Sequence, residues 1–338
     1  MRYIEAVRAQ GENLRSSRAA VVDQLKALDL EPWRGRRLGL VGMGASANAI
    51  GAALPGYWAA GLPATAWLGS ELGYAGAAAN FDAVIAVSQS GKSAEIVAAL
   101  AGPASACPRL VITDGPQSPA ARLADATIGL ALLEDSNVRT VGYTGTLQAL
   151  FLLAEALGQA LDGPDKAPTA DWDWLAGEVD RQLPAAERLA ATRLGALRDV
   201  RSFDVVGSGG QAGTAAQGAL LLREVAKRPA SAYETYQYLH GPIEAAGPGL
   251  GMLIIGGTRE ARLATSLAGT GAEIVLITAL EDVAPAPGLQ VFRVPAVDDA
   301  VLATLGILPL QTISGALADA AGLPDGEFRF HQDDTKVD

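Results

Sequence analysis

Short apolar runs and alanine-rich segments of helical pattern alternate along most of the chain. The N-terminal half holds the runs Leu38–Val41, Ala83–Val87 and Leu110–Thr113, and the C-terminal half holds Phe203–Val206, Met252–Ile255 and Ile274–Thr278. Uninterrupted runs of this length are typical of strands that a parallel sheet buries on both faces. The alternation therefore predicts an α/β protein made of two such domains.

A glycine turn recurs at matching places in the two halves, in Val41–Ala47 and in Val206–Ala212. Each copy follows an apolar run and precedes an alanine-rich helical pattern, which predicts a duplicated α/β unit. Glycine turns also occur in dinucleotide-binding folds, but neither copy completes their three-glycine spacing, and no acidic residue is placed to hold a ribose. The sequence thus disfavours a nucleotide cofactor.

Composition divides the chain into five parts. They are a helical lead-in at 1–36, a first α/β unit at 37–160, a linker with a helix at 161–198, a second α/β unit at 199–323 and a polar tail at 324–338. Gly163, Pro164 and Pro168 mark the linker, and a helical pattern resumes over Trp172–Arg198. A polar tail frays by default, but two phenylalanines and a near-terminal valine predict that this one docks.

Overall composition excludes several classes of function. A net charge of −11 argues against sequence-independent nucleic-acid binding, which needs clustered lysine and arginine. Cys107 is the only cysteine and the two histidines are too few for a histidine-rich centre, so neither a disulfide nor a metal site is expected. The longest apolar runs are broken by glycine or charge and are shorter than a bilayer requires, and no charged-then-apolar leader opens the chain. We expect a soluble, cytoplasmic protein that needs no metal or organic cofactor.

The segment Ser88–Ser93 is the strongest candidate for ligand binding. It follows the apolar run Ala83–Val87, precedes the helical pattern Ala94–Ala101, and offers three hydroxyls and a glycine. Such a turn aims backbone N–H groups and the positive end of a helix dipole at one point, which favours a phosphate dianion. The alternative is an ordinary strand-to-helix turn in which a serine only caps the helix. The matching segment of the second half, Ile254–Arg259, lacks the serine run, so one active site per chain is expected.

Three features carry a family resemblance over about residues 37–338: Ser88–Ser93, the paired glycine turns, and Arg223-Glu224 followed by His240-Gly241-Pro242. In these features the chain resembles the double SIS (sugar isomerase) domain of glucosamine-6-phosphate synthase. The resemblance implies two tandem SIS-type three-layer αβα sandwiches with mainly parallel sheets of flavodoxin-like type, with an N-terminal helix and a C-terminal tail. It also implies a homodimer with a shared active site, because in that family the matching histidine reaches the pocket of the neighbouring subunit.

The resemblance also implies roles for single residues of this chain. The positions that match the family's sugar-phosphate site are Ser46, Ser88, Gln89, Ser90 and Ser93. Glu224 matches a glutamate that moves a proton between C1 and C2, and His240 matches a histidine that assists ring opening. Lys336 is similar to a near-terminal lysine that forms an imine with the open-chain sugar.

Each of these three catalytic candidates has a structural alternative. Glu224 would be a solvated helix glutamate paired with Lys227 or Arg228. His240 would only mark a turn before a proline, and Lys336 would be an inert exposed lysine near the chain end.

The chain also departs from the family pattern. Leu221 stands where the synthase has a lysine one helical turn before its glutamate, and Val141 stands in the place of another lysine. Lys92 replaces the usual acidic residue after the Ser-Gln-Ser-Gly run. Met1 leads directly into the helical lead-in, so we expect no glutaminase half and no release of ammonia from glutamine.

Taken together, these features predict an enzyme that isomerises a hexose or aminohexose 6-phosphate through an enediol, with or without deamination. The sugar phosphate is then its small-molecule partner, and neither nucleic acid nor a membrane is expected to bind. The alternative is a sugar-phosphate sensor without turnover. Glu224 and His240 favour the enzyme, whereas Leu221, Val141 and the unusual tail favour the sensor. The sequence does not distinguish which sugar is bound.

Overall fold

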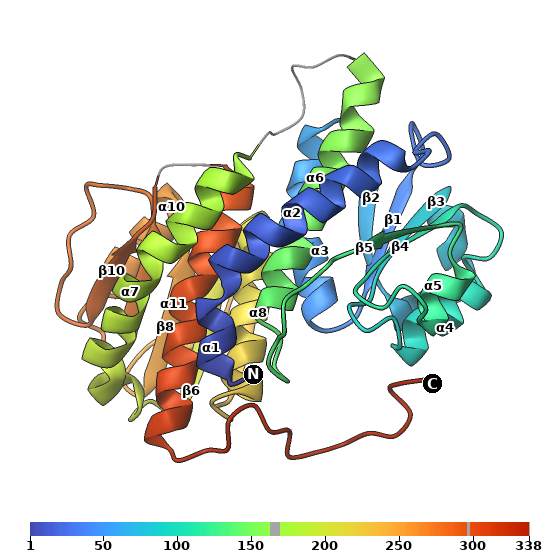
Figure 1. Cartoon of the computed structure of the whole chain (residues 1–338). Helices are drawn as coiled ribbons and strands as arrows, with labels where there is room; N and C mark the ends of the chain where they lie inside the picture. The colour runs from blue at the N-terminus through green and yellow to red at the C-terminus, as the bar shows by residue number, and fades with distance from the viewer. Residues whose placement is uncertain (163–169, 296–297, 338) are drawn as a thin grey trace. The chain divides into compact units, whose positions relative to one another are not determined.

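The computed structural model describes residues 1–162, 170–295 and 298–337, and it divides into two units that are described separately (Figure 1). The first-sheet unit comprises Glu12–Leu133, Val141–Asp173 and Arg329–Asp338. The second-sheet unit comprises Met1–Gly11, Glu134–Thr140 and Trp174–Phe328. The chain therefore passes several times from one unit to the other, and its tail contributes to both. The predicted linker residues Gly163, Pro164 and Pro168 lie outside the described residues.

Each unit is built on a five-stranded parallel sheet. The strands of the first sheet are β1 (Leu38–Gly42), β2 (Ala64–Leu68), β3 (Ala83–Val87), β4 (Arg109–Thr113) and β5 (Ala126–Gly129). Those of the second are β6 (Ser202–Gly207), β7 (Ala230–Glu234), β8 (Leu250–Ile255), β9 (Glu273–Thr278) and β10 (Leu289–Arg293). The orders are β2-β1-β3-β4-β5 and β10-β9-β8-β6-β7, so both follow the flavodoxin-like arrangement 2-1-3-4-5. The predicted α/β class with parallel sheets is confirmed.

The six predicted strands are the three inner strands of each sheet. Their residues are almost all buried, because helices cover both faces of an inner strand. The four strands that the apolar runs do not predict are β2, β5, β7 and β10, which lie at the sheet edges and mix buried with half-buried positions or, in β2, exposed ones. Continuous apolar runs do not identify edge strands, because other elements cover only part of each edge strand.

Helices form the outer layers of the first-sheet unit. They include α2 (Gln10–Ala27), α3 (Ala45–Ala59), α4 (Ala94–Ala101), α5 (Pro119–Leu123) and α6 (Val141–Asp162). α3 packs on α6, and α4 packs on α5, with the two pairs on opposite faces of the sheet (Figure 1). α2 protects the edge strand β5, because the Gln24 amide accepts from Gly129 N at 2.7 Å and donates to Gly129 O at 2.9 Å. A side chain thus replaces the missing neighbour strand.

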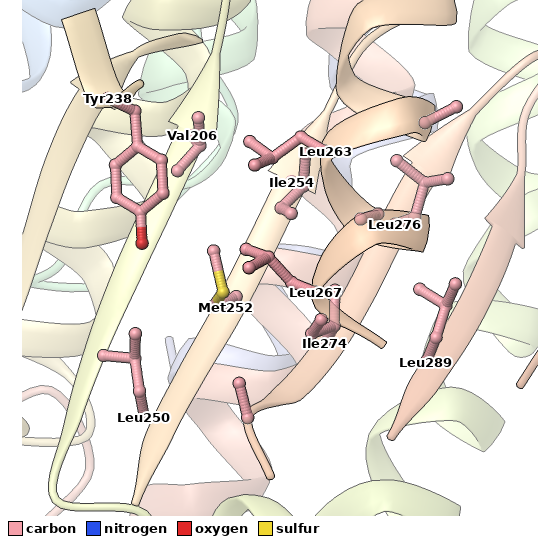
Figure 2. Packing of buried hydrophobic residues seen from close by; sticks show 13 residues of the cluster. Val206, Tyr238, Leu250, Met252, Ile254, Leu263, Leu267, Ile274, Leu276 and Leu289 are labelled. Carbon is pink, nitrogen blue, oxygen red and sulfur yellow. The ribbon is translucent and has the colours of Figure 1, made fainter. Parts of the chain in front are cut away.

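Alternate side chains of the second sheet face different helical layers. The helices of this unit include α1 (Tyr3–Arg8), α7 (Trp172–Leu197), α8 (Gly210–Glu224), α9 (Thr235–Tyr238), α10 (Thr258–Leu267) and α11 (Asp299–Ala320). Met252 and Ile254 pack with Leu263 of α10 in one buried cluster, as Figure 2 shows. On the other face a Cβ at Gly306 of α11 would lie 3.3 Å from Ile255 Cγ2, and α8 packs on α11. α8 and α11 therefore cover one face, and α10 covers the other.

One helix among the described residues, α11, is long and apolar enough to cross a membrane. The expectation that every apolar run is too short for this was wrong for α11. Its 18-residue apolar window is 83% buried, and the helix packs on α1, α8 and β9. Burial of this extent is that of a core helix, whose apolar residues face protein on all sides.

A carboxylate is buried within the second sheet. Asp204 of β6 is only 8% exposed, and its Oδ2 accepts a hydrogen bond of 3.1 Å from the Tyr238 hydroxyl. Figure 2 shows Tyr238 lying over the sheet beside Val206 and above Met252. Burial raises the pKa of Asp204, and the Tyr238 hydrogen bond opposes this only in part. Ionisation of Asp204 therefore costs stability in the folded state.

We expect Asp204→Asn to be more stable than the parent protein at pH 7, with the difference shrinking as the pH is lowered. The pKa of Asp204 is higher in the folded than in the unfolded chain, so its stabilising contribution is complete below the unfolded pKa and is lost as the pH rises through the folded pKa. Asparagine keeps an acceptor for Tyr238 and never ionises. Urea denaturation at several pH values measures the effect, with exposed Asp23→Asn as control. An Asp204→Asn protein that is destabilised equally at every pH would contradict it.

Candidate functional site

The predicted phosphate loop follows β3 as a tight turn. Ser88 is 2% exposed, and its N–H donates to Ile112 O of β4 at 3.1 Å, which extends the ladder into the loop. Its carbonyl then accepts from Gly91 N at 2.8 Å, which closes the turn. Gly91 has a φ of +65°, and a Cβ there would lie 1.8 Å from Ser118 Oγ. Only glycine fits, because both the backbone conformation and the close approach of α5 exclude a side chain.

Three hydroxyls of this loop gather where α4 begins. Ser88 Oγ donates to Ser93 Oγ at 3.4 Å, and Ser90 Oγ accepts from Lys92 N at 3.3 Å. Ser93 occupies the N-cap position, yet among the described residues its hydroxyl caps no amide of α4. The side chain of Ser93 therefore does not cap α4 in this structure. Hydroxyl donors and the positive end of an eight-residue helix converge at this turn.

Gln89 lies in the loop, and Ser46 lies in the helix that follows the neighbouring strand β1. The Gln89 carbonyl accepts from Asp114 N at 2.8 Å, and its side chain lies against the first turn of α6, where a Cβ at Gly142 would be 2.6 Å from Gln89 Nε2. Ser46 is in the first turn of α3, after Gly44 with its φ of +53°. β1 and β3 pair in parallel, so their turns leave the same edge of the sheet. The strand order reverses between these two strands, which is where ligands bind in open α/β sheets.

The C-terminal tail docks beside this loop. Thr335 O accepts from Ala94 N at 3.2 Å, Val337 N donates to Lys92 O at 2.9 Å, and Ser93 and Lys336 form an antiparallel bridge. The backbone of Lys336 is thereby held next to the phosphate loop, while its side chain is exposed. The predicted docking is confirmed, but its reason was incomplete, since the backbone of 335–337 makes these bonds and Phe330 is 82% exposed.

Glu224 ends α8 in the second-sheet unit and is half-buried. Burial raises the pKa of its carboxyl group, and the positive charges of Lys227 and Arg139 oppose the rise. A fully solvated helix glutamate would not show this shift. Arg139 lies far from Glu224 in the sequence, and no sequence pattern connects the two.

The structure does not bring His240 and Glu224 together within one chain. α8, which carries Glu224 at its end, covers the same face of the second sheet as α11. His240 follows α9 and is exposed, and its neighbours Tyr238, Leu239 and Ile243 pack in the cluster on the α10 face. The two candidates therefore lie on opposite sides of the sheet.

In the second sheet the strand order reverses between β6 and β8, and the carboxyl group of Glu260 lies at the helix start there. Gly209 after β6 has a φ of +55°, close to that of Gly44 in the first sheet. After β8, however, the turn into α10 is short, and Glu260 folds back so that its Oε2 accepts from Gly257 N at 3.0 Å. Glu260 is 2% exposed. Its carboxyl group therefore occupies the N-terminus of α10.

No group of three or more histidine, cysteine or acidic side chains that could hold a metal occurs within residues 1–162, 170–295 and 298–337. In the first-sheet unit the structure brings hydroxyl groups together near the start of α4. In the second-sheet unit it places the carboxyl group of Glu224 near two cations. Such groups bind anions and transfer protons.

Comparison with known proteins gives the same fold. No family model matches the chain. A glutamine–fructose-6-phosphate aminotransferase (isomerizing) of Gloeobacter violaceus is 27% identical over 285 residues, which cover 78% of this chain and 46% of that protein. The chain thus spans less than half the length of the curated relative.

Two solved structures extend the likeness to nearly the whole chain. The C-terminal domain of glucosamine-fructose-6-phosphate aminotransferase from Francisella tularensis has a TM-score of 0.83 and 18% identity, covering 97% of this chain and 98% of that one. Glucosamine-6-phosphate deaminase from Thermotoga maritima has a TM-score of 0.77 and 19% identity, with 99% of each chain covered. The chain is therefore similar in sequence to the isomerizing aminotransferases and has the fold of SIS phosphosugar isomerase structures.

Proposed function

We propose that this chain binds a hexose or aminohexose 6-phosphate and interconverts its aldose and ketose forms. The observation that carries the proposal is the loop Ser88–Ser93, whose hydroxyls meet the start of α4 at the strand-order reversal of the first sheet. A dianion is the ligand that such a loop favours. The similar proteins support the substrate class, because their names include fructose 6-phosphate and glucosamine 6-phosphate.

In this proposal the phosphate is held far from the reacting carbons, by Ser46, Ser88, Gln89, Ser90 and Ser93. Binding energy gained there fixes C1 and C2 against the base, which lowers the barrier of the chemical step. We propose that each sheet belongs to an SIS-type domain and that only the first sheet binds substrate. Glu260 supports this division because it occupies the corresponding helix start in the second sheet.

We propose Glu224 as the base that moves one proton between C1 and C2. A carboxyl group with a pKa raised by burial is a better proton carrier near neutral pH than a solvated one. Lys336, whose backbone lies beside Ser93, is proposed to meet the open-chain sugar. Where the substrate carries an amino group on C2, the same proton shift gives an imine, which water hydrolyses to a ketone and ammonia.

We further propose that the enzyme is a homodimer in which His240 of the partner subunit assists ring opening. His240 and Glu224 lie on opposite faces of the second sheet within a chain, which favours a second subunit as the source of the histidine. A closed two-fold pair supplies both, because each subunit then gives its own histidine to the other.

Replacing Ser88 and Ser90 together with alanine should weaken sugar-phosphate binding at least about tenfold. The change removes two hydroxyl donors to a charged acceptor, each worth roughly 1.5–3 kcal/mol. Thermal shift with fructose 6-phosphate and glucosamine 6-phosphate measures the loss, and exposed Ser105→Ala is the matched control. Equal ligand stabilisation in the double variant and the parent would place the phosphate elsewhere.

Glu224→Gln should bind sugar phosphate as well as the parent and lose about 10²–10⁴-fold in turnover, because the amide keeps the shape but not the basicity. Incubation with a panel of hexose and aminohexose 6-phosphates in deuterated water reports deuterium at C1 or C2, and released ammonia reports deamination. Exposed Glu12→Gln is the control. The parent rate should fall at low pH through a pKa above that of an ordinary glutamate. Binding without exchange in the parent would instead indicate a sensor.

Glu224→Gln and His240→Ala should each be inactive alone and regain part of their activity when unfolded and refolded together. Some mixed dimers then contain one site with both native residues. Mass spectrometry verifies that heterodimers form, and light scattering gives the oligomeric state. A monomer at working concentration, or verified heterodimers without activity, would show that His240 acts within its own chain.

A further inference from the structure

Lys227 turns the chain out of α8 in a conformation that is uncommon for a residue with a side chain. Its φ is +53°, in the left-handed region that normally favours glycine. The turn is closed by Arg228 N, which donates to Leu222 O at 2.9 Å. A lysine held in this way is maintained by contacts of its side chain or by the surrounding fold, because the backbone alone disfavours it.

The Lys227 ammonium joins the end of α8 to the start of the tail. Its Nζ donates to Glu224 O at 2.5 Å and to Glu327 O at 2.6 Å. The same nitrogen lies 5.8 Å from the centre of the Phe328 ring, in cation–π contact. Four residues of one unit, Glu224, Lys227, Glu327 and Phe328, thus meet around one positive charge.

This charge also acts on the Glu224 carboxyl group. Burial raises the pKa of Glu224, and Lys227 is the larger of the two positive charges that lower it. Arg139 is the other. Tyr3 of α1 is buried and interacts electrostatically with Glu224, and also with Asp135 of the 134–140 segment and Asp325 of the tail.

We propose that Lys227 is a positioning residue that fastens the start of the C-terminal tail to α8 and places a positive charge beside Glu224. The tail runs on from Phe328 to the residues that pair with the phosphate loop, so its attachment point adjoins the base while its far end adjoins the phosphate loop. The catalytic consequence rests on the proposed function, whereas the attachment and the placing of the charge do not.

Three variants separate the charge of Lys227 from its backbone. Lys227→Met keeps the stem and removes the charge, Lys227→Gly removes the charge and relieves the left-handed backbone, and Lys227→Arg keeps a charge. Lys26→Met on exposed α2 is the control. The measurements are a carbon-13 NMR titration of the Glu224 carboxyl, assigned with Glu224→Gln, and hydrogen exchange of residues 324–330.

In both Lys227→Met and Lys227→Gly the Glu224 carboxyl should titrate at higher pH than in the parent, and tail amides should exchange about threefold to tenfold faster, since charge-assisted hydrogen bonds are lost. Lys227→Arg should restore the titration. An unchanged titration in both charge-free variants overturns the proposal, as does a shift in only one, because the cause would then be the backbone. If the titration moves as expected but no variant or parent exchanges sugar hydrogens, the proposed function fails and the role of Lys227 stands.

Discussion

The first turn of a helix leaves backbone N–H groups without hydrogen-bond partners inside the helix. In both units the groups that meet these N–H donors at the strand-order reversal decide the chemistry of that edge of the sheet. In the second sheet Glu260 supplies a carboxylate from within α10 and closes the site. In the first sheet the longer loop Ser88–Ser93 keeps its hydroxyls at the turn, and the tail takes one amide, that of Ala94. Two sheets of the same strand order thus differ in which groups meet the start of the helix at the strand-order reversal.

The charge around Glu224 comes from residues that lie after it or far from it in the chain. Leu221, one turn before Glu224, is fully buried and apolar, so this side of the helix contributes no charge. Lys227 follows the helix in a left-handed turn, and Arg139 comes from the segment 134–140 of the same unit. The departure from the family pattern at Leu221 therefore does not leave the carboxyl group without a cation. A different set of residues provides the charge.

The placement of His240 follows from how the second sheet is covered. A parallel sheet is covered by helices on both faces. Each segment that follows a strand therefore packs on one of these two faces. Glu224 lies with α8, and His240 follows Tyr238, which packs against the α10 face. Glu224 and His240 are therefore close in sequence but lie on opposite faces of the second sheet.

Local pattern was enough to determine the α/β class, the six inner strands and the loop Ser88–Ser93, because burial on both faces and turn chemistry are written in neighbouring residues. The edge strands β2, β5, β7 and β10 form by pairing with the inner strand beside each of them, which local pattern does not show. Tertiary structure alone set the partners of Glu224, the closure of the second sheet by Glu260 and the pairing of Lys336 with Ser93. These contacts join segments that are distant in sequence. They depend on the packing of the whole unit, and no short stretch of sequence specifies that packing.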